Sequence, residues 1–431
     1  MNGNPLGLTP NYDRFARRGT HAPLAFSCQP VCGPSRSCLQ TGQYATTSGC
    51  WKNDIPLPAD ARTLAHEFAD AGYRTGYIGK WHLGDSASLG PVAPHQRGGY
   101  QDWLAANVLE MTSDAYDCRV YDEQSREVRL PGYRVDALTD AAIRYIDQRS
   151  REDQPFFLFF SLLEPHHQNH RDDYPAPEGL TQTYAGRWTP PDLAALVGNA
   201  PQNLPGYCGM IKRIDEAFGR MLDALKSLGL TDDTLVAFTS DHGCHFRTRN
   251  DEYKRSCHDA SIRVPLALGG GGFHGGGELS QMVSLLDLPP TLLAGAGVSV
   301  PPAMQGRSLT PLLRDRKAAW RDDVFVQISE SEVGRTLRTT RWKYSVRAAG
   351  VDAYAESAAS RYTETFLYDL LADPWELTNL VGNAAHAHVA AELRERLQRR
   401  MVEAGETAAH IEPAPVVSLP QRRVEVRDAT D

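Results

Sequence analysis

The sequence predicts an α/β fold: a large, mostly parallel sheet sandwiched by helices, followed by a smaller α+β domain. Helix-like and strand-like patterns alternate along the first 315 residues, which is typical of parallel sheets. The runs FFLFFSLL (156–163) and VPLALGG (264–270) are continuously apolar, as in strands buried on both faces. After about residue 315 this alternation gives way to short strands and one helix.

The elements of the first part follow one another in a regular order. Gly19 and Gly72 end the first two helices, because glycine is a common stop signal after a helix. The expected helices span 9–19, 61–73, 134–148 and 206–230, and the expected strands span 74–79, 156–163 and 234–240. VCGPSRSCLQTG (31–42) has no strong helix or strand period, and we expect a small polar turn there.

The second part predicts a separate small domain. DDVFVQIS, GRTLRTTRWKYSV and TETFLYDLLADPWELTNL are typical of short antiparallel strands, and AHVAAELRERLQRRMVEAG is typical of a helix. We therefore expect one domain over 1–315 and an α+β subdomain over 316–410. Residues 411–431 carry proline and charge without a period and predict a flexible tail. The long polar segment 165–205 is typical of a lid or binding loop.

Composition excludes several classes of protein. The net charge of −8 offers no basic surface for nucleic acid, and the longest apolar runs are too short to cross a bilayer. We therefore expect neither a nucleic-acid partner nor a membrane span. The eight cysteines in 431 residues form neither a disulfide framework nor a paired C-x-x-C zinc pattern.

Polar side chains follow three of the expected strands, where ligands bind in such sheets. Asp241 and His242 follow one strand and could coordinate a divalent cation, or Asp241 could simply cap a turn. Lys80 and His82 are two residues apart, so in an extended segment they face the same way and suit an anion. A solvated loop is the alternative for this pair.

Two further segments leave their roles open. EPHHQNH contains His166, His167 and His170, but it lacks the helical H-E-x-x-H spacing of a zinc protease. Lys254 is a lone lysine that by itself predicts an ordinary surface charge.

The combination of motifs is more specific than any one of them. CGPSRSCLQTG matches C-x-P-S-R-x-x-x-x-T-G, the first signature of type I sulfatases, and GYRTGYIGKWH (72–82) resembles the second. FFSLLEPHHQN, FTSDHG, KRSCHDASIRVPL, QGRSLTPLL and FLYDLLADPWELTNL resemble later blocks of that family. The resemblance covers residues 1 to about 405 and implies an alkaline-phosphatase-like fold and sulfate ester hydrolysis.

The resemblance implies a nucleophile that is made after translation. Cys32 matches the cysteine that a maturation enzyme oxidises to formylglycine (3-oxoalanine), whose hydrate attacks sulfur. Arg36 matches the arginine that holds the hydrate and the metal region. Lys80 and His82 match residues that contact the hydrate and the sulfate oxygens.

The leaving group and the metal have matching residues as well. His166 matches a sulfate-binding histidine that can help to protonate the leaving oxygen, with His167 as a weaker candidate. Lys254 matches the lysine that binds sulfate and assists the leaving group. Asp241 and His242 match two ligands of a calcium ion, with Mg²⁺ as the alternative metal.

The beginning of the chain departs from the family pattern. Sulfatases usually start with an apolar strand that ends in Asp-Asp or Asp-Gln, whereas this chain opens at MNGNPLGLTPNYD. We therefore expect a truncated chain without the first central strand and its one or two metal carboxylates. Such a chain should be unstable, bind calcium weakly and have little activity. Localisation, cytoplasmic or periplasmic, stays open because any signal peptide would lie in the same gap.

Other functions remain open on the sequence. A phosphoesterase or phosphonate monoester hydrolase of the same superfamily shares the fold, and a non-catalytic sulfate- or glycan-binding pseudoenzyme would explain missing carboxylates. The resemblance implies that the substrate is a sulfated small molecule or saccharide. Arg171, Arg187 and Trp188 in the long loop could clamp a sulfated sugar, or they could have no role.

Overall fold

The larger sheet of the main domain has the strand order β6-β5-β4-β3-β7 in the computed structural model, which describes residues 3–275 and 277–417. β3 lies between β4 and β7 and is parallel to both, with Ile78 opposite Leu104 and Phe160. β5 and β6 extend the sheet in antiparallel orientation. The strands are β3 (Arg74–Lys80), β4 (Asp102–Ala106), β5 (Cys118–Tyr121), β6 (Glu127–Leu130) and β7 (Phe156–Ser161).

Two smaller sheets complete this domain. The order β1-β10-β8 is antiparallel throughout, and in the order β11-β2-β9 the strand β2 is parallel to β11 and antiparallel to β9. Their strands are β1 (Thr20–His21), β2 (Ala25–Phe26), β8 (Val236–Thr239), β9 (Arg263–Val264), β10 (Leu266–Gly269) and β11 (Val283–Ser284).

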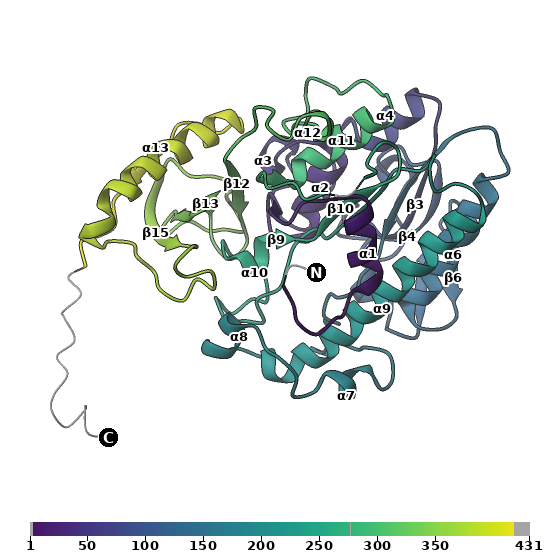
Figure 1. Ribbon diagram of the computed structural model, residues 1–431, viewed down its shortest axis with the longest axis horizontal. Helices are drawn as coiled ribbons and strands as arrows, with labels where there is room; N and C mark the ends of the chain where they lie inside the picture. Colours follow the sequence, from purple (N-terminus) through teal and green to yellow (C-terminus); the bar gives the residue numbers. More distant parts are fainter. Residues whose placement is uncertain (1–2, 276, 418–431) are drawn as a thin grey trace.

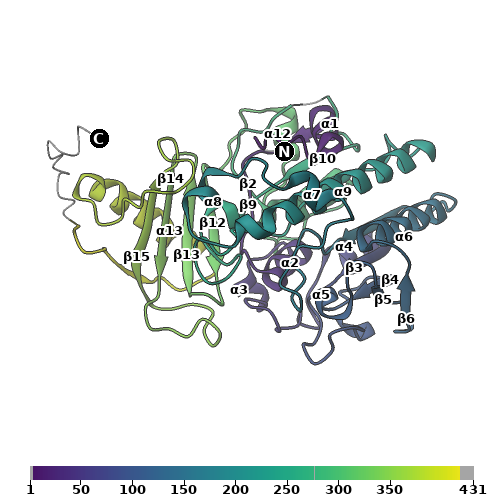
Figure 2. The same ribbon diagram turned by 90° about the horizontal axis from the view of Figure 1, so that it is seen from below.

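Helices cover the sheets on both sides (Figures 1 and 2). The long α9 contacts α1 and α6, whereas α2, α4 and α11 contact one another within a separate group. Thr63 caps α4 through a capping box with His66, which satisfies backbone donors at the start of that helix. The longer helices are α1 (Pro10–Arg18), α2 (Cys32–Thr41), α4 (Leu64–Asp70), α6 (Arg134–Arg149), α9 (Ala200–Ser227), α11 (Leu288–Gly295) and α13 (Ala387–Glu403).

The short helices lie mostly in the connections. They are α3 (Ala45–Ser48), α5 (Leu109–Thr112), α7 (Leu180–Tyr184), α8 (Pro191–Ala195), α10 (Asp259–Ile262) and α12 (Thr310–Arg314), with the 3-10 turns η1 (Pro94–Gln96), η2 (Leu285–Asp287) and η3 (Ala384–His386). No helix within the described parts of the chain has both the length and the apolar character needed to cross a membrane.

The C-terminal domain is an antiparallel sheet of β12 to β15 with α13 on its outer side (Figure 1). Alternate residues of β12 point to opposite faces: Val324 and Val326 pack against Phe26 of the main domain, whereas Phe325 joins the cluster that includes Leu397 of α13. The strands are β12 (Asp323–Ile328), β13 (Gly334–Thr339), β14 (Trp342–Arg347), β15 (Arg361–Asp369) and β16 (His410–Glu412), the last parallel to β15.

These observations confirm the predicted α/β fold class, and antiparallel strands extend the larger sheet beyond β4 and form the whole of the β1-β10-β8 sheet. The predicted helices and strands are present with shifted ends. Residues 31–42 differ from prediction, because they form α2 rather than a turn. The predicted tail over 411–431 begins inside β16, and its residues 418–431 lie outside the described part.

Candidate active site

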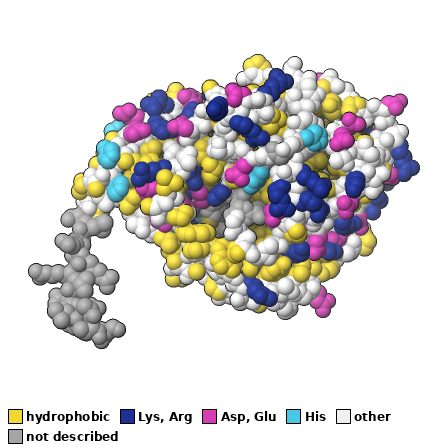
Figure 3. Space-filling model, viewed as in Figure 1, with side chains coloured by type: hydrophobic (Ala, Val, Ile, Leu, Met, Phe, Trp, Pro, Cys, Tyr) yellow, Lys and Arg dark blue, Asp and Glu magenta, His cyan; other side chains and the backbone are white. Residues whose placement is uncertain are grey.

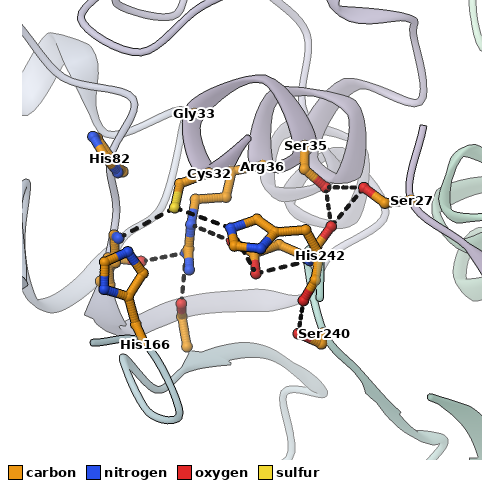
Figure 4. Close-up of polar contacts among 12 residues, drawn as sticks. Ser27, Cys32, Gly33, Ser35, Arg36, His82, His166, Ser240 and His242 are labelled. Carbon is orange, nitrogen blue, oxygen red and sulfur yellow. Dashed lines mark hydrogen bonds and ion pairs between the residues drawn. The ribbon is translucent and has the colours of Figure 1, made fainter. Parts of the chain in front are cut away.

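Cys32 is the first residue of α2, and three nitrogen atoms surround its thiol. Lys254 Nζ lies 2.8 Å from Sγ, His242 Nε2 3.3 Å and Lys80 Nζ 3.6 Å. Figure 4 shows Cys32 and Arg36 on this helix, with His242 and His166 on either side of them. Because a helix N-terminus carries partial positive charge, the helix adds to the field of the two lysines. The position of residue 32 is therefore built to hold negative charge.

The pKa of the Cys32 thiol reflects this environment. Burial by itself would raise the pKa, but Lys254, Lys80 and His242 outweigh burial and lower it well below its usual value. The side chain is only 1% exposed. The thiol is therefore closed off from solvent in the folded chain.

Arg36, one turn further along α2, ties the helix to the ends of the surrounding strands. Its Nη1 donates to the carbonyl oxygen of Lys80 at 2.8 Å and to Ser161 Oγ at 2.7 Å. Its Nε lies 3.3 Å from Asp241 Oδ2, and the pKa of Asp241 is lowered: burial would raise it, but His242 and Arg36 outweigh burial. Arg36 thus fixes β3, β7 and the segment after β8 relative to Cys32.

Asp241 and His242 lie directly after β8, beside Cys32. The Asp241 carbonyl oxygen accepts hydrogen bonds from Ser27 Oγ at 2.6 Å and Ser35 Oγ at 2.7 Å. His242 Nδ1 is 2.9 Å from the carbonyl oxygen of Gly243, so Nδ1 carries the proton and Nε2 presents a lone pair. Ligand atoms of Cys32, Asp241 and His242 lie within 4.8 Å of one another.

Two side chains of this donor set, those of Asp241 and His242, fit as ligands of one divalent cation. The Asp241 carboxylate is a usual ligand of Ca²⁺ or Mg²⁺, whereas the imidazole is more usual for transition metals. His242 already has the tautomer and the carbonyl partner that metal-bound histidines adopt. The residues present therefore fit a metal ion in part and would leave further coordination positions to other ligands.

His166 is buried against Tyr253 on the opposite side of the site. Its Nδ1 donates to the carbonyl oxygen of His167 at 2.6 Å, and its Nε2 accepts from the Tyr253 hydroxyl at 2.7 Å. Burial, followed by Lys80, lowers the pKa of His166 to about 4, so it is neutral at pH 7. His167 pairs instead with Asp172 at 3.2 Å.

Glu110 is a central residue that the sequence motifs did not reveal. It lies in α5, four residues after the end of β4, and its Oε1 is 2.6 Å from Lys80 Nζ. His82 Nδ1 and His166 Nε2 lie 3.9 Å and 4.0 Å from the same oxygen. Its place shortly after a strand is the one signal that could have identified it, since NVLEMTSD (107–114) has no recognisable motif.

The structure brings most of the predicted residues to one place. The residues that converge around Sγ are Cys32, Arg36, Lys80, His166, Asp241, His242 and Lys254. His82 lies at the edge beside Glu110, and its φ of 60° departs from the extended backbone that we expected. Lys254 is not an ordinary surface charge, because it is only 1% exposed.

An apolar cavity of about 1150 Å³ extends from this site into the main domain. β7 and β8 both line it, and within the described residues each strand pairs on one side only. Their side chains are therefore half-buried, whereas the sequence predicted buried strands. The face in Figure 3 is hollowed near its centre, beside basic side chains over α1. The expectation of a further strand in this part of the domain stays a prediction.

This fold and this site are those of a sulfatase. The family described as "Sulfatase" matches residues 1–298, and the family described as "N-sulphoglucosamine sulphohydrolase, C-terminal" matches residues 251–403. The chain therefore belongs to the sulfatase family, and it is a sulfuric ester hydrolase with an alkaline-phosphatase-like fold.

Individual relatives agree with this assignment. The chain is 28% identical to an "Ulvan-active sulfatase" of Formosa agariphila, over 94% of this chain and 78% of that protein. It is 27% identical to the "Multifunctional alkaline phosphatase superfamily protein PehA" of Trinickia caryophylli, over 95% and 93% of the two chains. A structure described as a complex with "its substrate D-Glucosamine-2-N, 6-O-disulfate" superposes with a TM-score of 0.74 at 24% identity, covering 92% of this chain and 93% of that one.

Proposed function

We propose that this sulfatase hydrolyses the sulfate ester of a saccharide or small molecule with formylglycine at position 32 and a calcium ion, Mg²⁺ being the alternative metal. The observation that carries the proposal is the position of Cys32, with two lysine ammonium groups and an imidazole directed at its Sγ. A formylglycine hydrate at this position supplies an oxygen nucleophile for sulfur and a second hydroxyl that allows sulfate to be released.

The side chains around residue 32 have distinct tasks in this proposal. Lys80 and Lys254 bind the sulfate oxygens and stabilise the charge that develops on them in the transition state. Such stabilisation by preorganised donors is usually the largest single contribution to the rate enhancement of an enzyme. Arg36 holds the nucleophile and Asp241 in register through the contacts of its guanidinium. Asp241 and His242 would hold the metal ion, which supplies electrostatic stabilisation of the same oxygens.

The leaving oxygen needs a proton, and two groups are placed to provide it. His166 is neutral, its Nδ1 proton is directed at the carbonyl oxygen of His167 and its Nε2 accepts from Tyr253, so it can donate to the leaving oxygen only after Nε2 has taken up a proton from solvent. Lys254 carries protons directly beside Sγ. Both groups support release of an alcohol rather than of an alkoxide.

A maturation enzyme is the protein partner that this proposal requires. Because Cys32 is buried within α2, oxidation is proposed to occur on the unfolded segment. For the substrate, the names of the ulvan-active relative and of the glucosamine disulfate complex favour a sulfated saccharide. Trp188, which is 36% exposed, is available for stacking, whereas Arg171 is already paired with Asp173 at 2.9 Å.

The test is a panel of sulfated saccharides and aryl sulfates, assayed with protein that was co-expressed with a maturation enzyme. Release of inorganic sulfate that requires both residue-32 oxidation and a divalent metal supports the proposal. Activity of a preparation in which Cys32 is unmodified would refute the formylglycine mechanism.

Hydrolysis of phosphate or phosphonate esters is the second candidate function. It is favoured by the 27% identity to a relative whose name describes a multifunctional member of the superfamily. Comparing turnover of an aryl sulfate with turnover of the matching aryl phosphate separates the two. Metal content of the purified protein separates either enzyme from a non-catalytic sulfate-binding protein.

A further inference from the structure

Glu110 places a fixed negative charge inside a site that is otherwise built to hold anions. The carboxylate is 3% exposed, and its Oε1 lies 2.6 Å from Nζ of Lys80, which is itself 1% exposed. That ammonium group is in turn 3.6 Å from Cys32 Sγ. A single ammonium group therefore separates the carboxylate from the position where the sulfate group reacts.

The surroundings of Glu110 show that it does more than neutralise one lysine. Its Oε2 is buried and has no hydrogen-bond partner among the described residues, and the same is true of the facing His82 Nδ1. A buried carboxylate oxygen without a donor is costly, so a purely structural ion pair would be expected to satisfy it. Burial would raise the pKa of Glu110, but Lys80, His82 and His166 lower it, so the group stays ionised.

We propose that Glu110 is a specificity-determining residue that makes the site prefer singly charged sulfate esters to doubly charged phosphate monoesters. The inference rests on the proposed function, namely that the ester group binds beside residue 32. A sulfate monoester carries one negative charge at neutral pH, whereas a phosphate monoester carries nearly two because its second pKa is about 6. Lys80 and Lys254 attract both esters, but Glu110 repels the second charge of the phosphate in addition to the first.

The expected effect is large because the charges are close and shielded from water. Two unit charges about 6 Å apart, at an effective dielectric constant of about 20, repel each other enough to change a rate about 10²-fold. The extra charge of a phosphate monoester therefore costs it about 10² in kcat/KM relative to a sulfate monoester. Removal of the Glu110 charge should therefore raise kcat/KM for the phosphate monoester by about the same factor.

The experiment compares kcat/KM for an aryl sulfate and the matching aryl phosphate in the matured wild-type protein and in Glu110→Gln. The amide has nearly the same shape and still offers Oε1 to Lys80, so the change is mainly one of charge. We expect the phosphate-to-sulfate ratio to rise about 10²-fold in the variant. A phosphonate monoester with the same aryl leaving group carries one negative charge and should not gain in the same way, which separates charge from the identity of the central atom.

Two further measurements exclude a general structural effect. In the wild-type protein, the phosphate rate should rise as pH falls through about 6 and the ester becomes singly charged, and this rise should be weaker in Glu110→Gln. Glu364→Gln is the matched control, because Glu364 is a buried carboxylate paired with Arg394 in the C-terminal domain. Its phosphate-to-sulfate ratio should equal that of the wild-type protein.

The outcomes distinguish the two proposals. If sulfate esters are hydrolysed and the ratio does not change in Glu110→Gln, the role of Glu110 is wrong while the proposed function stands. If neither sulfate ester nor phosphate ester is turned over by matured protein, the proposed function fails first. If Glu110→Gln does not fold, the phosphate-to-sulfate ratio is measured for Glu110→Asp instead. The shorter side chain moves the negative charge away from the site, so the ratio should rise by a smaller factor. An unchanged ratio in Glu110→Asp overturns the inference.

Discussion

Replacement of Lys254 by methionine should abolish most of the activity while leaving the fold intact. Lys254 is 1% exposed, and its Nζ lies 2.8 Å from Cys32 Sγ and 3.2 Å from His242 Nε2. Among the described residues, no carboxylate oxygen lies within 4.0 Å of Lys254 Nζ. Lys254 is therefore a buried charge directed at the reacting group rather than at a structural partner.

The magnitude follows from these contacts. Loss of one preorganised donor to a developing negative charge lowers the rate about 10²- to 10³-fold, or about 3 to 4 kcal/mol. In the matured protein, which lacks the Cys32 thiolate, the free energy of unfolding should change little, because methionine fills a similar volume and removes a desolvated charge that has no carboxylate partner. In protein whose Cys32 is not oxidised, the pKa of the thiol should rise, since Lys254 is the foremost charge that lowers it.

Lys343 offers a matched control, since it is equally buried but has the opposite role. It lies in the C-terminal domain, 2.6 Å from Asp259, and also pairs with Glu376. Lys343→Met leaves the buried Glu376 carboxylate without its cation and Asp259 with Arg338 alone, so the free energy of unfolding should fall by about 3 to 5 kcal/mol. Lys254→Met should thus lose activity while its free energy of unfolding stays close to that of the wild-type protein. In Lys343→Met the main effect should be a lower free energy of unfolding.

The assay combines steady-state kinetics on an aryl sulfate with chemical denaturation of each variant. Thiolate absorbance as a function of pH reports the pKa of Cys32 in the unmatured protein. Wild-type kcat in Lys254→Met would refute the role of this lysine. A loss of stability in matured Lys254→Met as large as in Lys343→Met would refute the reasoning about its missing carboxylate partner.

Three further predictions follow from the same site. Co-expression with a maturation enzyme should convert the thiol of Cys32 to an aldehyde, seen by mass spectrometry of its peptide, and Cys32→Ala should be inactive; conversion at another cysteine instead would contradict this. Because the pKa of buried His166 is lowered to about 4, the unfolded state binds the extra proton between about pH 6.5 and 4. The free energy of unfolding should therefore decrease as the pH is lowered across that window, by roughly 3 kcal/mol for this residue. The decrease should be smaller in His166→Gln when acid denaturation of the two proteins is compared, and an equal decrease would exclude His166 as a cause. Asp241→Asn and His242→Ala should each lower the metal content measured by elemental analysis, and chelation should inactivate the wild-type protein reversibly; full metal content in both variants would place the metal elsewhere.

Local sequence determined much of this protein. The C-x-P-S-R motif around Cys32 and the Gly-Lys-x-His segment around Lys80 are short and specific, so they identified the family and the candidate nucleophile without a structure. Hydrophobic periodicity likewise predicted α6, α9, β3 and the antiparallel C-terminal sheet, because an element's apolar face is written into consecutive residues.

Tertiary structure decided which of these residues act together. Lys254 reaches Cys32 across 222 residues of chain, and its burial could not be inferred from a lone lysine. Glu110 and Tyr253 belong to no motif and gain their importance only from the neighbours that folding gives them. The helix that begins at Cys32 was predicted as a turn, because its 10 residues are all buried and show no amphipathic pattern. Periodic patterns report one element and its solvent, whereas charge, burial and contact in an active site depend on residues that are distant in the chain.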